Sequence, residues 1–135
     1  MKAVEIKPNV FWVGSIDWDR RLFDELIPLP DGTGYNAYLI EGSKKNALID
    51  TVDPSKTAEL ITRLRDTKAD VDYIIAHHAE QDHSGSIPDI LKLYPKAKIV
   101  CTPKCKPMLM DLLFIPENKI TTVVNPKNWT LFRFF

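Results

Sequence analysis

The spacing of apolar residues changes at Asp53, and this change limits the folds open to the chain. Before Asp53, apolar residues lie in short β-rich runs bounded by turn residues, a pattern typical of strands and hairpins. We expect strands at 4–7, 10–15, 35–41 and 46–50. The polar stretch from Asp17 to about Gly34 contains two prolines and an Asp-Gly pair, and we expect it to be irregular.

After Asp53, helices alternate with strands. Asp53 can cap a helix that begins at Pro54 and continues, on apolar residues at helical spacing, to about Thr67. Ser86 and Asp89 resemble a capping box before a second helix. We further expect buried strands at 71–76 and 97–101, a helix at 103–114 and a final strand at 119–124. Hairpins followed by this alternation indicate an α/β layered domain whose sheet is covered by helices.

Length and charge narrow the classes of protein. The 135 residues fit one domain, and 18 basic residues balance 18 acidic ones, so charge gives no reason to bind nucleic acid or an anionic membrane. No apolar run approaches the ~20 residues of a membrane span, and the first eight residues are too charged for a signal peptide. Cys101 and Cys105 are expected to be buried structural thiols, which agrees with a reducing compartment. We expect a cytoplasmic protein.

All three histidines of the chain lie within the segment 77–83. This segment follows a predicted strand and precedes a predicted helix, so we expect a loop at the carboxyl end of the strand, where α/β sheets bind ligands. Its four potential metal donors are His78, Glu80, Asp82 and His83. Imidazole suits iron and zinc, and carboxylates favour harder ions. The alternative is a solvated polar loop without a role.

We expect the four donors to serve two metals. Alternate residues of a tight loop can face the same side, so His78 and Glu80 would bind one metal, and Asp82 and His83 the other. Two metals ~3.5–4 Å apart are the usual arrangement of such a site.

The motif His78-x-Glu80-x-Asp82-His83, followed by Ser84-Gly85, resembles that of flavodiiron proteins, also called A-type flavoproteins. Flavodiiron proteins share their di-iron domain fold with the metallo-β-lactamase superfamily. Hydrolases of that superfamily carry His-x-His-x-Asp-His and normally bind zinc. A carboxylate at the position of Glu80 marks the flavodiiron branch and suits iron. The resemblance includes segments 13–18, 34–40 and 47–52 and covers the chain to about Val124.

The resemblance implies a metallo-β-lactamase-like αββα sandwich, of which residues 1–135 are about the first half, without the flavodoxin-like domain. It implies a di-iron centre that reduces dioxygen to water or nitric oxide to nitrous oxide. Electrons would come from FMN in a flavodoxin-like domain or from a rubredoxin-type donor, within a head-to-tail homodimer. Asp50 would hold a ligand histidine in place, or else serve as a turn or helix-entry carboxylate; His77 would have a supporting or surface role.

The family completes its metal site with two later histidines and a bridging aspartate, and no histidine follows His83. We therefore expect an incomplete di-iron site that needs a complementary half-domain or second chain. The apolar run 129–135 reads as a strand, and alone the chain would expose an apolar sheet face. Two alternatives stay open: a zinc-dependent metallo-β-lactamase-like hydrolase, and an inactive remnant that binds one metal weakly or associates with a partner.

Overall fold

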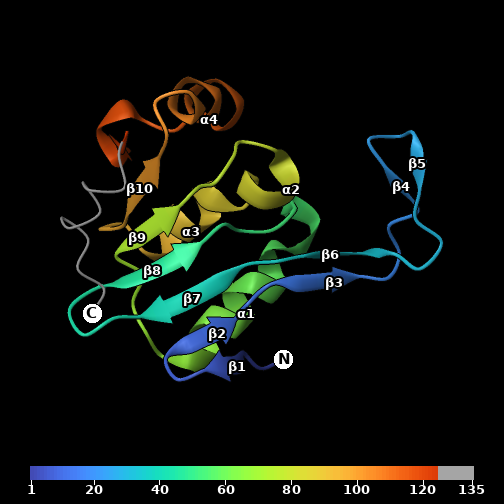
Figure 1. The fold of residues 1–135 in the computed structure, drawn as a ribbon, viewed down its shortest axis with the longest axis horizontal. Helices are drawn as coiled ribbons and strands as arrows, with labels where there is room; N and C mark the ends of the chain where they lie inside the picture. The colour runs from blue at the N-terminus through green and yellow to red at the C-terminus, as the bar shows by residue number, and fades with distance from the viewer. Residues whose placement is uncertain (125–135) are drawn as a thin grey trace.

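A computed structural model describes residues 1–124, which form one seven-stranded sheet, two two-stranded ladders and a set of helices (Figure 1). The strands are β1 (Val4–Lys7), β2 (Val10–Trp12), β3 (Ser15–Asp17), β4 (Leu22–Phe23), β5 (Ile27–Pro28), β6 (Thr33–Tyr35), β7 (Tyr38–Glu41), β8 (Asn46–Ile49), β9 (Tyr73–Ile75), β10 (Lys98–Cys101) and β11 (Ile120–Thr122). The helices are η1 (Pro54–Lys56), α1 (Thr57–Thr67), α2 (Gln81–Ser84), α3 (Ile87–Leu93), α4 (Cys105–Leu113) and η2 (Glu117–Lys119).

The seven-stranded sheet has the order β1-β2-β7-β8-β9-β10-β11 and changes from antiparallel to parallel pairing at β8. Parallel neighbours need long crossovers, and α1, α3 and α4 supply them. Ile75 of β9 lies opposite Ile49 of β8 and Val100 of β10. The carboxyl ends of these three strands therefore meet at one edge of the sheet.

The main core lies between the sheet and the helices. One apolar residue from each of β7 to β10 packs with apolar residues of α1 and α3. All are fully buried: Leu39, Leu48, Ile74 and Ile99 from the strands, and Leu60, Leu64, Ile87 and Ile90 from the helices. Successive strand residues point to opposite faces, so their neighbours form a second, smaller cluster of Ala47, Ile75 and Val100. No helix of residues 1–124 contributes to that cluster. The predicted sheet covered by helices is confirmed, with the helices on one face.

The second sheet face differs from the sequence expectation. We expected it to be exposed, but Ala47, Ile75 and Val100 are buried at its centre. Only flanking residues such as Ile49 and Tyr73 are partly accessible. The predicted strand at 129–135 lies outside the described residues. None of the helices within residues 1–124 is long and apolar enough to cross a membrane.

Both helical regions begin where predicted, but the second lacks the predicted side-chain cap. The Asp53 carboxylate accepts a hydrogen bond from Ser55 N at 2.9 Å, Pro54 opens η1, and α1 ends at Thr67. The prediction of a capping box at Ser86 is wrong. The Ser86 hydroxyl donates to Val52 O at 2.8 Å and makes no capping hydrogen bond to α3. The segment that leads into α1 packs against the start of α3, and its carbonyl oxygen accepts the hydrogen bond from this hydroxyl.

The stretch 17–34 contains short strands, where we predicted irregular structure throughout. β3 pairs with β6, and β4 pairs with β5 in a hairpin that projects from the body of the molecule (Figure 1). The predicted strand 10–15 accordingly divides into β2 and β3, and 35–41 into β6 and β7. The β3–β6 pairing joins residues about 18 apart, for which local composition gives no signal.

A polar cluster ties the base of this projection to η1, the turn that leads into α1. Asp17 lies 3.4 Å from both the Tyr35 hydroxyl and the Lys56 ammonium. Burial acts to raise the pKa of Asp17, but the Asp19 N–H and the Lys56 charge outweigh burial and lower it. Burial raises the pKa of Tyr35 to about 12, so the phenol keeps its proton and can donate to Asp17. The cluster therefore holds β3 and β6 against η1.

Candidate metal centre

The predicted donor segment follows β9, but only part of it is a loop. Gln81–Ser84 forms α2, and the backbone N–H groups of His83 and Ser84 both donate to Glu80 O. His78 and Glu80 therefore precede the helical turn, whereas Asp82 and His83 lie on it. The expectation that the whole segment is a loop is wrong, because a single hydrogen-bonded turn follows Glu80.

The α2 turn is fastened to the neighbouring elements. Thr51, directly after β8, donates from both its backbone N–H and its hydroxyl to His83 O, at 2.7 and 2.8 Å. The buried Ser84 hydroxyl donates to Ala79 O at 2.9 Å. A Cβ at Gly85 would lie 2.6 Å from Gln81 O and from the Pro54 ring, so glycine is needed where α2 meets η1. Sequence analysis missed Thr51; its place at a strand end beside Asp50 was the only signal.

The structure brings two of the four predicted donors into ring contact. The His78 and His83 ring centroids lie 5.0 Å apart with perpendicular planes. From spacing, we assigned His78 to one metal and His83 to the other. The contact therefore joins two donors that were predicted to bind different metals. Asp82 joins them, with its Oδ2 3.5 Å from His83 Nε2.

Two buried nitrogen atoms in this cluster lack partners. Nδ1 of His78 and Nδ1 of His83 are buried and have no hydrogen bond from the described part of the chain. A buried polar atom without a partner is costly, and native structures rarely contain one without a reason. A metal ion takes up imidazole lone pairs in the way that these atoms require. The donor set fits a transition metal in this respect.

The two carboxylate donors face a shared pocket. Glu80 and Asp82 line a pocket of about 390 Å³. Its other walls are Arg20, Phe23, Asp24, Asp53 and Gln81. Within residues 1–124, no three His, Cys, Asp or Glu side chains converge on one metal position. The described residues therefore supply pairs of donors rather than a closed coordination sphere.

Asp50 and His77 form a separate pair at the same edge of the sheet. Asp50 is almost fully buried and has a positive φ of 55°. One carboxylate oxygen accepts from His77 N and the other contacts His77 Nδ1, both at 2.8 Å. The His77 side chain is 62% exposed. Asp50 thus holds the residue immediately before His78, rather than one of the predicted ligand histidines.

The two cysteines lie near the carboxyl-end edge of the sheet, and burial makes their thiols unreactive. Cys101 ends β10 and Cys105 begins α4, and both are buried, as predicted. Burial, with the neighbouring Cys105, raises the pKa of the Cys101 thiol to about 12. Burial also raises the pKa of Cys105. Because the thiolate is the metal-binding form, these protonated thiols suit a structural role.

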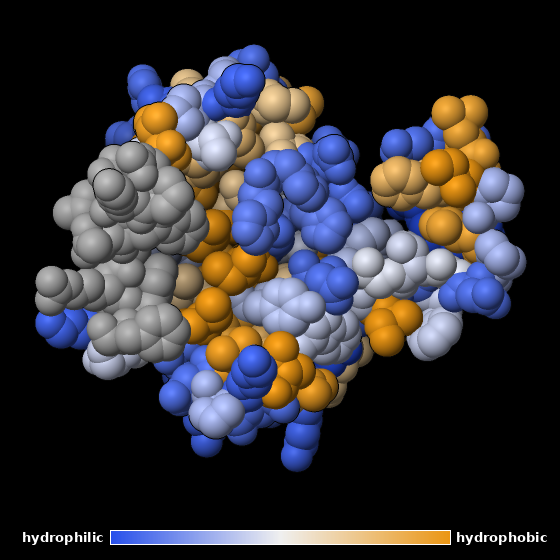
Figure 2. All heavy atoms as spheres, viewed as in Figure 1, coloured by the Kyte–Doolittle hydropathy of each residue, from blue (hydrophilic) through white to orange (hydrophobic). Residues whose placement is uncertain are grey.

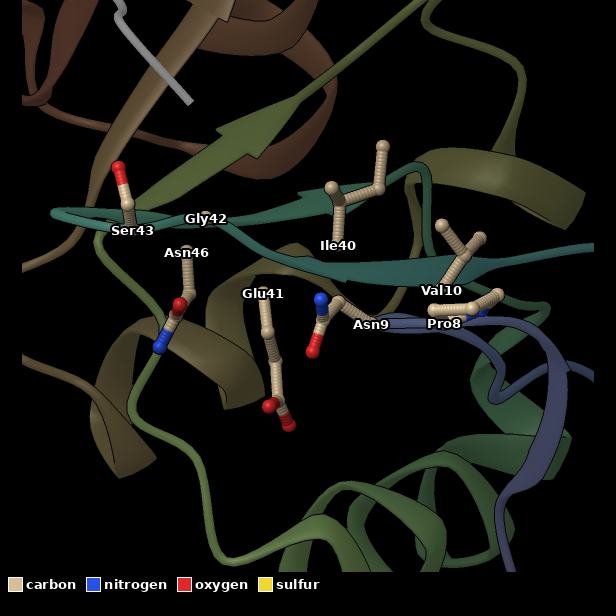
Figure 3. A pocket seen from close by; sticks show the side chains of 8 residues that line it. All are labelled: Pro8, Asn9, Val10, Ile40, Glu41, Gly42, Ser43 and Asn46. Carbon is tan, nitrogen blue, oxygen red and sulfur yellow. The ribbon is translucent and has the colours of Figure 1, made fainter. Parts of the chain in front are cut away.

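A second pocket lies at the opposite end of β8 and has a different character. Its volume is about 350 Å³, and turns β1–β2 and β7–β8 form it (Figure 3). Figure 3 shows Asn9, Glu41 and Asn46 on one side of the strands and Val10 and Ile40 on the other. With one carboxylate and no imidazole or thiol, this pocket does not offer the donors of a transition-metal site.

Comparison with known proteins places these features in a family context. The family model described as the metallo-beta-lactamase superfamily matches residues 30–133. A type A flavoprotein of Rhodobacter capsulatus is 37% identical over 112 residues, covering 82% of this chain and 26% of that protein. An anaerobic nitric oxide reductase flavorubredoxin of Salmonella arizonae is 43% identical over 104 residues, which cover 74% of this chain and 21% of that protein.

Solved structures agree with the sequence relatives. The crystal structure of the flavodiiron protein from Giardia intestinalis superposes with a TM-score of 0.84 at 29% identity, covering 92% of this chain and 30% of that one. The chain spans about a quarter of the length of the curated relatives that it matches. The fold is therefore metallo-β-lactamase-like, and it corresponds to a portion of the larger flavodiiron proteins.

Proposed function

Because the chain belongs to the metallo-beta-lactamase superfamily, we propose that it forms the metal-binding part of a flavodiiron-type oxidoreductase that reduces dioxygen or nitric oxide. The relatives' names support this proposal, since they include a type A flavoprotein and a nitric oxide reductase flavorubredoxin. Glu80 supports it as well, because a carboxylate between the two histidines favours a harder ion such as iron.

The observation that carries the proposal is the pair of buried, unpartnered Nδ1 atoms of His78 and His83. We assign His78 and Glu80 to one iron and Asp82 and His83 to the other. When bound, the iron pair supplies the one-electron redox chemistry and binds the diatomic substrate.

The protein's own contribution is to hold the donors in place. Thr51 donates hydrogen bonds to the carbonyl oxygen of His83 and holds that residue in place. The Asp50 carboxylate accepts from the backbone N–H of His77, just before His78. Glu80 accepts two backbone hydrogen bonds at the start of α2, which sets the direction of Asp82 and His83. Outer contacts of this kind orient the donor atoms of a metal site and tune the metal.

The proposed site needs groups beyond the four donors. Further ligands would come from a complementary half-domain or a second chain, and electrons from FMN in a flavodoxin-like domain or from a rubredoxin-type donor. We propose a cytoplasmic homo-oligomer in which residues 1–135 form a partial di-iron domain. The competing function is zinc-dependent hydrolysis, for which the superfamily match itself is the supporting observation.

The test is anaerobic titration of the chain with ferrous iron and, separately, with zinc. We expect iron to bind with a stoichiometry that falls when either His78→Asn or His83→Asn removes an unpartnered nitrogen. The matched control is His77→Asn, which removes an imidazole from the same segment but from outside the assigned donors. Circular dichroism should show that all three variants keep the fold.

Three results would count against the proposal. Equal loss of iron in all three variants would show that the assigned donors are not special. Clear preference for zinc together with ester or lactam turnover would favour the hydrolase. No metal binding with the fold intact would favour an inactive remnant.

A further inference from the structure

The β4–β5 hairpin and the α2 region line one pocket, although they are distant in the sequence (Figure 1). Glu80 and Asp82 line this pocket of about 390 Å³ from the donor segment, and Phe23 and Asp24 line it from the hairpin. Figure 2 shows hydrophilic residues over α2 and apolar residues on the projecting hairpin. The hairpin is therefore a wall of the candidate metal centre.

The hairpin is held in place by few contacts. β4 and β5 contain two residues each, and within 21–30 only Phe23 and Leu29 are partly buried. Its backbone bonds include Leu26 N to Phe23 O at 3.0 Å and Leu29 N to Arg21 O at 2.8 Å. An isolated two-stranded hairpin is marginally stable in water, so one strong charged contact at its tip is enough to shift it.

The tip of the hairpin is strained next to the pocket. Asp24 and Glu25 have positive φ, at 48° and 60°, a region that asparagine and glycine tolerate better than other residues. Strained residues cluster at ligand clamps, where their side chains are used. Of these two residues, Asp24 lines the pocket and Glu25 does not. The strain therefore directs attention to the Asp24 carboxylate.

The charges around the pocket indicate what this carboxylate would bind. Four carboxylates and one guanidinium line the pocket: those of Asp24, Asp53, Glu80 and Asp82, and that of Arg20. Arg20 is already paired with Asp53 at 3.5 Å, and no ion pair in the described part of the chain engages Asp24. Like charges around one pocket repel one another, and a bound divalent cation removes that repulsion.

The histidines supply a second, independent observation. The buried Nδ1 atoms of His78 and His83 lack partners, in the same segment as Glu80 and Asp82. As described for residues 1–124, however, no three donor side chains meet at one position. A carboxylate on a weakly held hairpin can supply a further donor by moving toward the pocket.

We propose that Asp24 is an additional donor to the metal centre, and that the β4–β5 hairpin closes over the pocket when a divalent transition-metal ion binds. The inference rests on the metal-binding function proposed above. Closure brings the Asp24 carboxylate toward Glu80 and Asp82, and Phe23 moves with it and shields the pocket from water. The Arg20–Asp53 ion pair keeps the base of the hairpin in place.

The first test measures the affinity of the 135-residue chain for ferrous iron under anaerobic conditions. Asp24→Asn should weaken binding by about tenfold, because a donor carboxylate is lost. Glu25→Gln is the matched control, since it removes the same charge from the same turn but outside the pocket, and affinity should stay within about twofold. Asparagine tolerates the positive φ at position 24, so the variant should keep its fold, which circular dichroism checks.

The second test follows closure by limited trypsin digestion and mass spectrometry. Ferrous iron should slow cleavage after Arg21, at the start of the hairpin, by about fivefold or more in the wild-type chain and much less in Asp24→Asn. Cleavage after Lys44, in the exposed turn between β7 and β8, is the internal control and should not change.

The outcomes separate this inference from the proposed function. Unchanged affinity in Asp24→Asn, or equal losses in Asp24→Asn and Glu25→Gln, would overturn the inference; if His78→Asn still lowered iron binding, the metal centre would stand without the hairpin. Iron binding without protection at Arg21 in the wild-type chain would overturn closure and, with it, the inference. A wild-type chain that binds no iron would overturn both.

Discussion

Asp50 connects the end of β8 to the start of the donor segment through a single carboxylate. Its two oxygens contact the backbone and the ring of His77, and its own backbone N–H donates to Ile75 O at 2.9 Å. Because the Asp50 carboxylate accepts from the His77 N–H, its loss would leave that N–H without its acceptor. The ring of His77, in contrast, is mostly exposed and contributes less to folding.

We predict that Asp50→Ala lowers the free energy of unfolding by about 2–4 kcal/mol, since two hydrogen bonds to a buried carboxylate are lost. His77→Ala should cost less than about 1 kcal/mol, because most of that side chain faces solvent. Urea unfolding followed by circular dichroism measures both. Equal losses in the two variants would contradict the role assigned to the Asp50 carboxylate.

Cys101 makes folding sensitive to alkaline pH. Its thiol ionises near pH 9 in the unfolded chain, whereas burial raises the pKa to about 12 in the folded protein. Between these values the unfolded state binds fewer protons, so stability falls as pH rises. Below pH 9 this contribution is fully present.

We expect the free energy of unfolding to fall above pH 9 by up to about 1.4 kcal/mol per pH unit for this one proton. The Cys101→Ala variant should show a smaller slope between pH 9 and 10.5, whatever its absolute stability. Urea titrations at several pH values give the slopes. Parallel slopes would rule out Cys101 as the source.

At the scale of elements, α1 shows how local signals succeed. Asp53, Pro54 and the apolar spacing act within a few residues of one another. The helical segment that they predict begins at Pro54, as the 3₁₀ helix η1, and ends with α1 at Thr67. Ser86 shows the opposite case, because its hydroxyl bonds to Val52, 34 residues earlier. A cap signal is read correctly only when no distant acceptor competes for the same hydroxyl.

The end of α1 offers a test of backbone strain. Lys68 follows the helix with a φ of 60°, a conformation that costs L-residues about 1–2 kcal/mol and that glycine adopts freely. Lys68→Gly should therefore raise the free energy of unfolding by about 0.5–1 kcal/mol, after the entropy cost of glycine. Lys68→Ala keeps a Cβ and should give no gain. A similar gain in both variants would point to the lysine side chain instead.

At the scale of the whole molecule, the described sheet is packed unequally on its two faces. Leu48 faces the helices and is fully buried, whereas the adjacent Ile49 faces the smaller cluster and is partly accessible. No described helix covers the second face. Stability should therefore depend far more on the first face.

We predict that Leu48→Ala costs about 2–5 kcal/mol, as for other fully buried leucines, and that Ile49→Ala costs about 1 kcal/mol. Equilibrium unfolding of both variants gives the comparison. If Ile49→Ala cost as much as Leu48→Ala, the second face would be as tightly packed as the first.

The sequence by itself determined the α/β class, the limits of the helical segment from Pro54 to Thr67 and the grouping of four candidate metal donors after one strand. These features depend on spacing between near neighbours, and apolar periodicity and caps record that spacing directly. The donor cluster could be recognised because His78 to His83 span only six residues. Which donors contact each other could not, since that depends on the turn of α2 and on Thr51, 32 residues from His83.

The tertiary structure alone decided the β3–β6 pairing, the projecting hairpin, the role of Ser86 and the contact of His78 with His83. Each depends on partners whose positions are known only when the chain has folded. Asp17 and Gly34 bound a stretch that composition marks as irregular, yet pairing between its two ends made strands of them. Hydrogen bonds between distant residues satisfy backbone groups that local signals leave open, and this is why the sequence did not predict them.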